Sequence, residues 1–183
     1  SVADIPQDLA QQLGISVIPV LVRFGHEVFR DGIDLTTDQF YRRLISDREF
    51  PNTAVPAPED IARVYQALAA ETDQILSVHL SAKYSAVYQA ALTARELVHG
   101  NCRIEVIDTR SAIMGEGLLA ITAAKEAQKG TGMDQIISLL ETLIPKTHVR
   151  MAFDTLEYLK RGGRIGTAQA LMGSLLHVHP IAG

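Results

Sequence analysis

Short apolar runs alternate along the chain with longer stretches in which apolar residues recur every three or four positions. The clearest runs are 15–24, 74–80 and 103–108, and a stretch of helical periodicity comes after each of them. Such runs are typical of strands buried in a sheet, although Pro19 suggests an edge or a bulge in the first. Strands that alternate with helices indicate βαβ units, so the pattern predicts an α/β fold with a mostly parallel sheet flanked by helices.

The expected helices carry recognisable start and stop signals. A short first helix ends at Gly14, the residue type favoured just past a helix C-terminus. A capped amphipathic helix is expected over 36–45, and Pro58 opens another with acidic residues in its first turn. RDGID at 30–34 predicts a turn, and NTAVPAP at 52–58 predicts a loop that its prolines hold extended.

The pattern changes after residue 109. Two helical stretches, 111–128 and 133–144, follow one another with only a KGTG break between them. We therefore expect an N-terminal α/β domain over 1–110 and the beginning of a second α/β domain over 111–183. The chain opens on a helix cap and stops as a strand begins, so a first strand and a C-terminal part are expected to be missing.

Composition narrows the classes of function. The 183 residues are 47% hydrophobic and 21% charged, and a net charge of −4 with scattered basic residues argues against nucleic-acid binding. A single cysteine, Cys102, excludes an intramolecular disulfide and a cysteine-rich zinc site, and it makes the cytoplasm the expected compartment. No segment approaches the ~20 apolar residues of a membrane span, and the first residues do not resemble a signal peptide. No stable membrane insertion is expected.

The junctions between strands and the helices that follow are the candidates for ligand binding, because ligands of α/β proteins bind at the carboxyl ends of strands. Ser85 lies where a strand has ended and a helix begins, so free N–H groups and its hydroxyl could hold an anion. Thr53, in a neighbouring loop, could add a second hydroxyl. Two hydroxyls and backbone N–H groups suit one carboxylate or phosphate held without a formal positive charge. Plain helix capping is an equally simple explanation of Ser85.

A serine hydrolase, or another small-molecule α/β enzyme, is the alternative function. Asp108 or Asp154 and His177 or His179 follow Ser85 in a chain order that a catalytic triad can have. The sequence KYSAV around the serine is not the G-x-S-x-G of a hydrolase elbow, however, and order without geometry is weak evidence.

The histidines give little indication of a metal site. His177 and His179 would point to the same side of a strand, but no further ligand has an obvious claim on the same metal. His79 lies in an apolar strand and is expected to be a hydrogen-bonded interior residue. His26 and His148 are expected at the surface. No metal is predicted.

The last part of the chain contains a glycine-rich segment, KRGGRIG at 160–166, that follows a helix and lacks the P-loop pattern. Gly162 and Gly163 are expected to end that helix, and Arg164 on the resulting turn could face a phosphate or a partner protein. GEG at 115–117 does not follow a strand in the frame of a dinucleotide site, so no cofactor is predicted. The remaining expected elements are a strand over 148–154, a helix over 155–162, a helix over 167–176 and a strand from residue 177.

Several stretches match, in order, the motifs of one family. SVADIP resembles the end of T-D-S-T-A-D-L-P, ISVIPVLV with RDGID resembles its second strand and turn, and NTAVPAP stands in the place of T-S-Q-P-S. SVHLSAKYSAVYQAA resembles S-I-H-I-S-S-G-L-S-G-T-Y-Q-S-A, and IEVIDTRSAIMGEGLL resembles V-I-D-S-x-S-x-S-M-G-x-G. LEYLKRGGRI and MGSLLHVHPI match L-E-Y-L-K-K-G-G-R-I and G-S-L-L-x-I-K-P-I. The whole chain thus resembles the DegV family, bacterial fatty-acid-binding proteins that present acyl chains to a fatty acid kinase.

The resemblance implies that Thr53 and Ser85, with Ala86 beside them, hold the carboxylate of a long-chain fatty acid. Lys83, Ala86 and Val87 depart from the family motif: the loss of two glycines makes the turn less permissive, and Lys83 could supply a countercharge. The tail would run between the two domains. The kinase would supply ATP, so this protein would be a carrier and not an enzyme, with Arg164 assigned to contact with the kinase or the acyl phosphate. The family also has a strand before the segment that corresponds to Ser1, and it continues past the last residue.

Overall fold

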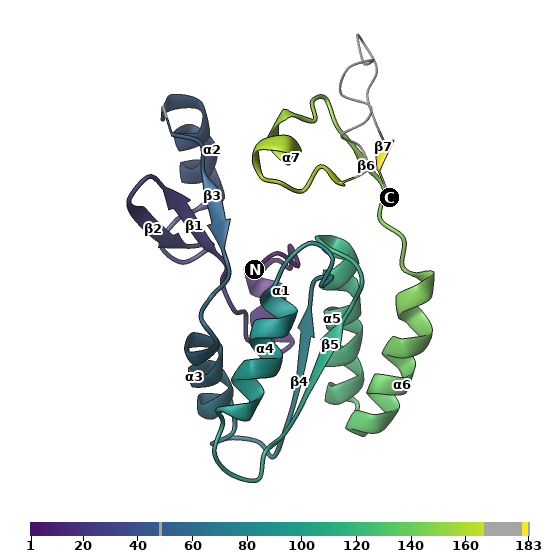
Figure 1. The fold of residues 1–183 in the computed structure, drawn as a ribbon. Helices are drawn as coiled ribbons and strands as arrows, with labels where there is room; N and C mark the ends of the chain where they lie inside the picture. Colours follow the sequence, from purple (N-terminus) through teal and green to yellow (C-terminus); the bar gives the residue numbers. More distant parts are fainter. Residues whose placement is uncertain (48, 167–180, 183) are drawn as a thin grey trace. The chain divides into compact units, whose positions relative to one another are not determined.

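The computed structural model describes residues 1–47, 49–166 and 181–182 (Figure 1). The chain divides into two compact units, Ser1–Thr147 and His148–Gly183. The boundary expected between residues 110 and 111 differs from this division, because it falls inside the first unit. The two helical stretches that follow it pack with the strands that precede it, so they belong to the first unit.

The elements of the first unit are α1 (Gln7–Gln12), β1 (Leu21–Phe24), β2 (Glu27–Arg30), α2 (Thr37–Ser46), β3 (Asn52–Ala54), α3 (Pro58–Leu68), β4 (Gln74–His79), α4 (Val87–Glu96), β5 (Arg103–Asp108), α5 (Met114–Gln128) and α6 (Met133–Leu143), followed by a 3₁₀ turn (Ile144–Lys146). Those described in the second unit are β6 (Met151–Ala152), α7 (Glu157–Arg161) and β7 (Ile181–Ala182). The mixed α/β class is confirmed.

The strands form small sheets of different kinds. β4 and β5 pair in parallel, in register from Gln74 with Arg103 to His79 with Asp108. β1 pairs antiparallel with both β2 and β3, and β6 pairs antiparallel with β7. Among the strands of the described residues, the expected parallel pairing therefore holds for β4 and β5, whereas β1, β2 and β3 pair antiparallel. The apolar run 15–24 becomes a strand only from residue 21, where it folds back on β2 through a short hairpin loop.

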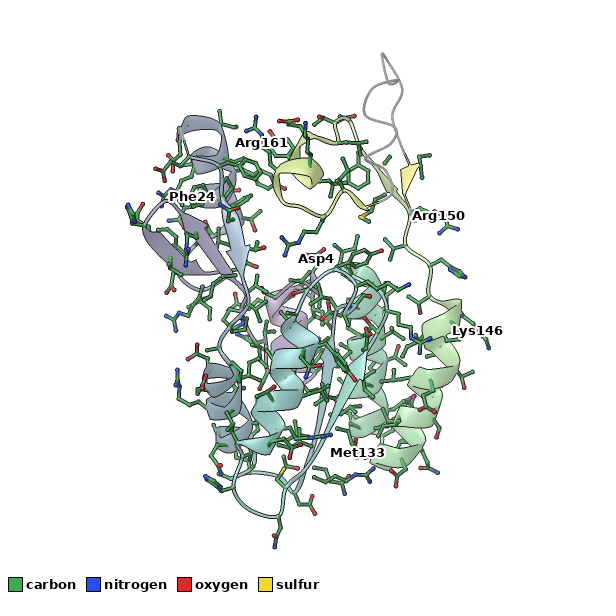
Figure 2. The ribbon with its side chains drawn as sticks, viewed as in Figure 1. Asp4, Phe24, Met133, Lys146, Arg150 and Arg161 are labelled. Atoms are coloured by element: carbon green, nitrogen blue, oxygen red, sulfur yellow. The ribbon has the colours of Figure 1, made fainter. Side chains whose placement is uncertain are left out.

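The parallel pair β4–β5 is covered on both faces (Figure 1). Side chains on a strand alternate between the two faces of a sheet. On one face Ile75 and Ile104 pack with residues of α3 and α4, including Tyr65 and Ala91. On the other face Leu76, Val78 and Ile107 pack with residues of α5 and α6. In Figure 2 the side chains of α3 and α4 lie on one side of the strands and those of α5 and α6 on the other. Burial on both faces explains why apolar residues point to both sides of these strands.

Local signals in the sequence placed several elements correctly. Gly14 follows α1 with a φ of +66°, which a residue with a side chain adopts only at a cost. Thr36 caps α2 through a capping box with Gln39, and Pro58 is the first residue of α3. In contrast, residues 52–54, expected in a loop, form β3.

The second unit contains the glycine-rich turn. Gly163, with a φ of +71°, follows the end of α7; its N–H donates to Lys160 O at 3.0 Å, and Arg164 N donates to Leu159 O at 2.8 Å. This pair of bonds is a Schellman motif, so the prediction that the glycines end the helix is confirmed. The helix predicted over 167–176 lies outside the described residues, as does nearly all of the strand predicted from residue 177. Within the described part of the chain, none of the helices has the length and apolar character that crossing a membrane requires.

Candidate functional site

The loop between β4 and α4 is a tight turn organised by Ser81, whose side chain is only 1% exposed. Its backbone N–H donates to Ser111 O at 2.7 Å, and its carbonyl accepts from the N–H groups of Tyr84 at 2.9 Å and Ser85 at 3.2 Å. Its Oγ accepts from Lys83 N at 3.2 Å. Ser81 therefore has a structural role, which is to fix the orientation of the residues that follow it.

Ser85 is half-buried on this turn, with its Oγ 3.3 Å from the N–H of Val87, from which it accepts a hydrogen bond. α4 begins at Val87, and the residue in the N-cap position is Ala86, with no side-chain cap. Ser85 is thus not the N-cap residue of α4, because the serine lies one residue before the N-cap position. A serine hydroxyl that accepts one hydrogen bond still has a proton to donate.

The loop after β5 is tied to this turn. Asp108 Oδ1 accepts hydrogen bonds from Arg110 N at 2.8 Å and from Ala82 N at 3.4 Å. Thr109 is fully buried, and its hydroxyl donates to His79 O at 2.9 Å. The loops at the carboxyl ends of β4 and β5 therefore form one connected edge.

Backbone conformations along this edge are unusual. Arg110 and Ile113 have φ values of +52° and +49°. Left-handed φ is unfavourable for a β-branched residue, at an energy of roughly 1–3 kcal/mol, and it persists only where the surroundings impose it. Ile113 directly precedes α5, so the strained position fixes where that helix begins.

The other predicted site residues lie on other elements. Thr53 is the middle residue of β3, opposite Val22 of β1, and is exposed. Arg164 is an exposed residue of the second unit, where its Nη1 donates to Gly162 O at 2.5 Å. The fold thus brings Ser85 and Ala86 together on one turn, with Thr53 on a strand and Arg164 on the turn after α7.

The described residues contain no arrangement that would make Ser85 a nucleophile. The Asp108 carboxylate accepts backbone N–H groups, and His79 Nε2 shares a hydrogen bond of 2.8 Å with Ser77 Oγ. His177 and His179 lie outside the described residues. In the part of the chain that the structure covers, no three His, Cys, Asp or Glu side chains are grouped so that they could hold a metal ion.

A buried polar chain, which the sequence analysis noticed only in part, lies beside β4. Tyr65 Oη donates to Ser77 Oγ at 2.6 Å, and Ser77 in turn contacts His79. Burial lowers the pKa of His79 to about 4, so the imidazole is neutral at pH 7 and supplies no countercharge to an anion. The expectation of an interior, hydrogen-bonded His79 is confirmed, as are exposed positions for His26 and His148.

Glu116, in the first turn of α5, is a functional candidate that the sequence analysis missed. It is 6% exposed, and its Oε2 has no hydrogen-bond partner among the described residues. Burial raises its pKa to about 7, while a hydrogen bond from the backbone N–H of Leu80 acts in the opposite direction. A charged residue between two glycines, in the part of the helix that is otherwise apolar, was the signal in the sequence.

A groove with a cavity volume of about 530 Å³ runs along β4 within the first unit. Its walls come from both faces of β4, from α3 and α5, and from the segments before and after α1. Tyr65, His79 and Glu116 all contribute to them.

Comparison with known proteins shows consistent similarity. A family model described as "Uncharacterised protein, DegV family" matches residues 1–183. A DegV domain-containing protein from Caldanaerobacter subterraneus subsp. tengcongensis is 36% identical over 181 residues, 99% of this chain and 64% of the relative. Protein DegV of Bacillus subtilis is 32% identical over 182 residues, with the same two shares. The chain therefore spans 64% of the length of these relatives.

Solved structures give the same result. A DegV family protein from Thermus thermophilus, described by its fatty acid binding, is 38% identical with a TM-score of 0.91. DegV from Bacillus subtilis, described as a fatty acid binding protein, is 32% identical with a TM-score of 0.87. A stearic-acid-binding protein from Eubacterium ventriosum is 28% identical with a TM-score of 0.89. Each match covers 99% of this chain and 64% of the solved one.

Proposed function

This chain belongs to the DegV family, and from that premise we propose that it binds a long-chain fatty acid whose carboxylate is held by Thr53 and Ser85. The observation that carries the proposal is the turn after β4. There a half-buried hydroxyl at Ser85 lies two residues before the start of α4, and a buried serine fixes the turn. Related proteins described as binding fatty acids share this fold at TM-scores near 0.9.

The electrostatics of the turn suit a carboxylate. The first N–H groups of a helix have no partner inside the helix, and the helix dipole favours negative charge beside them. Ser85 adds a hydroxyl donor, Thr53 a second, and Ala86 contributes backbone alone. Lys83 is exposed on the same turn and would act as a screened countercharge at the mouth of the site.

The acyl tail requires an apolar surface near the head group. Three exposed apolar side chains lie on the loops and the first helical turns that follow β4 and β5: Tyr84, Met114 and Leu118. They would form one wall of the tail site, and the second domain of a full-length protein would form the other. At ~0.8 kcal/mol per buried CH₂, a long chain offers roughly 10 kcal/mol before the cost of association, so the tail supplies most of the affinity.

The partner in this proposal is a fatty acid kinase. A carboxylate held by hydroxyl and N–H donors stays accessible at one oxygen, which could accept the γ-phosphoryl group of ATP to give an acyl phosphate and ADP. The kinase would supply ATP and the catalytic groups, so this protein would act as a carrier. Arg164, with its backbone fixed by the Schellman motif, would contact the kinase or the acyl phosphate.

Because the second domain would form the other wall of the tail site, native mass spectrometry of a full-length form with oleate tests the head-group assignment. We expect a 1:1 complex, and we expect Ser85→Ala and Thr53→Ala each to weaken it about 10–100-fold, which corresponds to the ~1.5–3 kcal/mol of a hydrogen bond to a charged group. Thr93→Ala is the matched control, because Thr93 lies on α4 and its hydroxyl donates to Gln89 O on the same helix. Equal affinity of Ser85→Ala, Thr93→Ala and the unmodified chain would refute the assignment.

A further inference from the structure

Four successive residues at the end of β4, 79–82, are each hydrogen-bonded to the end of β5, to the loop after it, or to the first turn of α5. Two of these links join groups that do not ionise near neutral pH. His79 O accepts from the N–H and the hydroxyl of Thr109, at 3.0 and 2.9 Å, and Ser81 N donates to Ser111 O at 2.7 Å. These two links therefore hold the end of β4 in the same way from pH 6 to pH 8.

The other two links end on carboxylates. Ala82 N donates to Asp108 Oδ1 at 3.4 Å, and Leu80 N donates to the carboxylate of Glu116. Asp108 is half-buried, whereas Leu80 and Glu116 are only 7% and 6% exposed. Among the four links, the one between Leu80 and Glu116 is thus the one that ends on a deeply buried ionisable group.

The second oxygen of Glu116 makes the ionised form of this side chain costly. Oε2 is buried and has no hydrogen-bond partner among the described residues. Because a buried charge that is not fully hydrogen-bonded is unfavourable, the neutral form is favoured, and burial raises the pKa of Glu116 to about 7. The neutral carboxyl group accepts the Leu80 N–H without a charge, whereas the carboxylate accepts it more strongly and brings a negative charge into the interior. The link to Leu80 therefore differs between pH 6 and pH 8.

The charged groups that face Glu116 come from the N-terminal segment. After burial, the amino group of Ser1 has the largest influence and favours the ionised form, while Asp4 opposes it. Asp31, on the turn after β2, interacts with both Asp4 and the Ser1 amino group. His79, on β4, is neutral at pH 7 because burial lowers its pKa to about 4. In any longer form the Ser1 nitrogen is an uncharged amide, and Glu116 then keeps its proton to a higher pH.

The backbone on either side of Glu116 is held in place. Ile113, directly before α5, has a φ of +49°, and its carbonyl accepts the N–H of Gly117 at 3.1 Å. Gly117 in turn lies directly against the backbone of Ala3. The first turn of α5 is therefore fixed, and the Glu116 side chain stays in the interior, beside Leu80.

Leu80 directly precedes the residue that organises the turn after β4. The carbonyl of Ser81 accepts the N–H groups of Tyr84 at 2.9 Å and Ser85 at 3.2 Å. A displacement of the Leu80 backbone is thus passed on to the Ser85 hydroxyl through a single residue, Ser81.

We propose that Glu116 is a positioning residue for the turn that carries Ser85: it fixes the end of β4 through the Leu80 N–H, and it alters the position and the electrostatics of the turn when its carboxyl group gains or loses a proton. The consequence for a ligand rests on the proposed function. An ionised Glu116 adds negative charge to the edge that would hold the fatty acid carboxylate, so the affinity for the fatty acid falls as the pH rises through 7. By linkage, a bound fatty acid makes Glu116 harder to ionise.

An NMR pH titration of the unliganded chain tests the positioning role. We expect the amide proton resonances of Leu80 and Ser85 to shift together, with a midpoint near pH 7. In Glu116→Gln this shift should disappear, although the amide oxygen of the glutamine still accepts the Leu80 N–H. Glu126→Gln, on the same helix and paired with a surface lysine, is the matched control and should leave the shift unchanged. A titration of Leu80 and Ser85 that persists in Glu116→Gln would overturn the proposal.

Glu116→Leu separates the hydrogen bond from the charge, because leucine removes the acceptor of the Leu80 N–H. We expect the Leu80 amide to exchange with solvent at least tenfold faster in Glu116→Leu than in Glu116→Gln, and the amides of residues 133–143 in α6 to exchange equally in both. Equal exchange of the Leu80 amide in the two variants would show that Glu116 does not hold the end of β4. If Glu116→Leu does not fold, the titration of Glu116→Gln decides alone.

Oleate binding to a full-length form at pH 6 and pH 8.5 tests the consequence for the ligand. The ionisation of oleate itself is common to all variants, so the ratio of the affinity of Glu116→Gln to that of the unmodified protein isolates Glu116. We expect this ratio to be at least threefold larger at pH 8.5 than at pH 6, and a ratio that is the same at both would refute the linkage. Absence of oleate binding in both proteins at either pH would instead refute the proposed function, while the NMR titration of the unliganded chain still decides the positioning role.

Discussion

Two buried ionisable residues in the wall of the groove have pKa values that are shifted in opposite directions. An unfolded chain protonates His79 near pH 6.5, but the folded chain does so only near pH 4, so the free energy of unfolding falls as the pH drops through this window. For Glu116 the folded chain keeps the proton up to about pH 7, whereas the unfolded chain loses it near 4.5. The free energy of unfolding then falls as the pH rises from 4.5 to 7. Between pH 4.5 and 6.5 the two contributions oppose each other.

Single substitutions should separate these contributions. As the pH rises from 4.5 to 7, the free energy of unfolding of Glu116→Gln should increase by about 3 kcal/mol relative to that of the unmodified chain, because each pKa unit corresponds to ~1.36 kcal/mol. As the pH falls from 6.5 to 4, the free energy of unfolding of His79→Gln should increase by a similar amount relative to that of the unmodified chain. Urea unfolding of the three proteins across this range measures the differences. Curves that stay parallel at every pH would contradict the burial of both groups.

At the scale of single residues, the candidate site shows what local sequence signals can predict and what they cannot. Ser85 was proposed as a site residue because a strand that ends and a helix that begins are both visible in a few residues. Its exact place was missed by one position, because the tight turn around Ser81 depends on a contact with Ser111, thirty residues away. Glu116 was missed altogether, since its burial follows from tertiary packing and not from the pattern around it.

At the scale of elements, α5 is fitted closely to the segment before α1. A Cβ added at Gly117 would lie 2.2 Å from the backbone oxygen of Ala3, a distance that requires backbone movement. Glycine in a helix interior is ordinarily destabilising by about 0.5–1 kcal/mol relative to alanine. Here the contact reverses that sign, and glycine is required for helix α5 to pack where it does.

The substitution Gly117→Ala should therefore destabilise the chain by about 1–3 kcal/mol, the usual range for overpacking. Gly132→Ala is the matched control: its nearest neighbour would be Gln135 Oε1 at 3.8 Å, an ordinary contact. Thermal unfolding of both variants measures the difference. A Gly117→Ala protein as stable as the control would show that α5 and the N-terminal segment are not in contact.

Elements with their own signals were predictable, and those that depend on distant partners were not. The capping box of α2, Pro58 at the start of α3 and the runs rich in apolar residues at β4 and β5 are local features. β3 reads as a proline-bordered loop and becomes a strand only because β1 lies beside it. The run from residue 15 has the composition of a buried strand, but in the described residues strand pairing begins only at Leu21.

At the scale of the whole molecule, a single edge organises the proposed function. The loops after β4 and β5 are linked through Asp108 and Thr109, and the same edge carries Ser85. A domain boundary near residue 110 was expected because the alternation of strands and helices ends there. In the structure α5 and α6 pack on β4 and β5, and the division into two units comes later in the chain. Sequence periodicity shows where the pattern changes and does not show which sheet a helix covers.

The most direct measurement is an NMR titration of a full-length form of the chain with oleate labelled with ¹³C at its carboxyl carbon. The account predicts that the carboxyl resonance shifts on binding, together with the amide resonances of residues 82–87 and of Thr53. Ser85→Ala should reduce the carboxyl shift, and Thr93→Ala should preserve it. A carboxyl resonance that shifts while the amides of 82–87 stay in place would put the head group elsewhere and contradict the account.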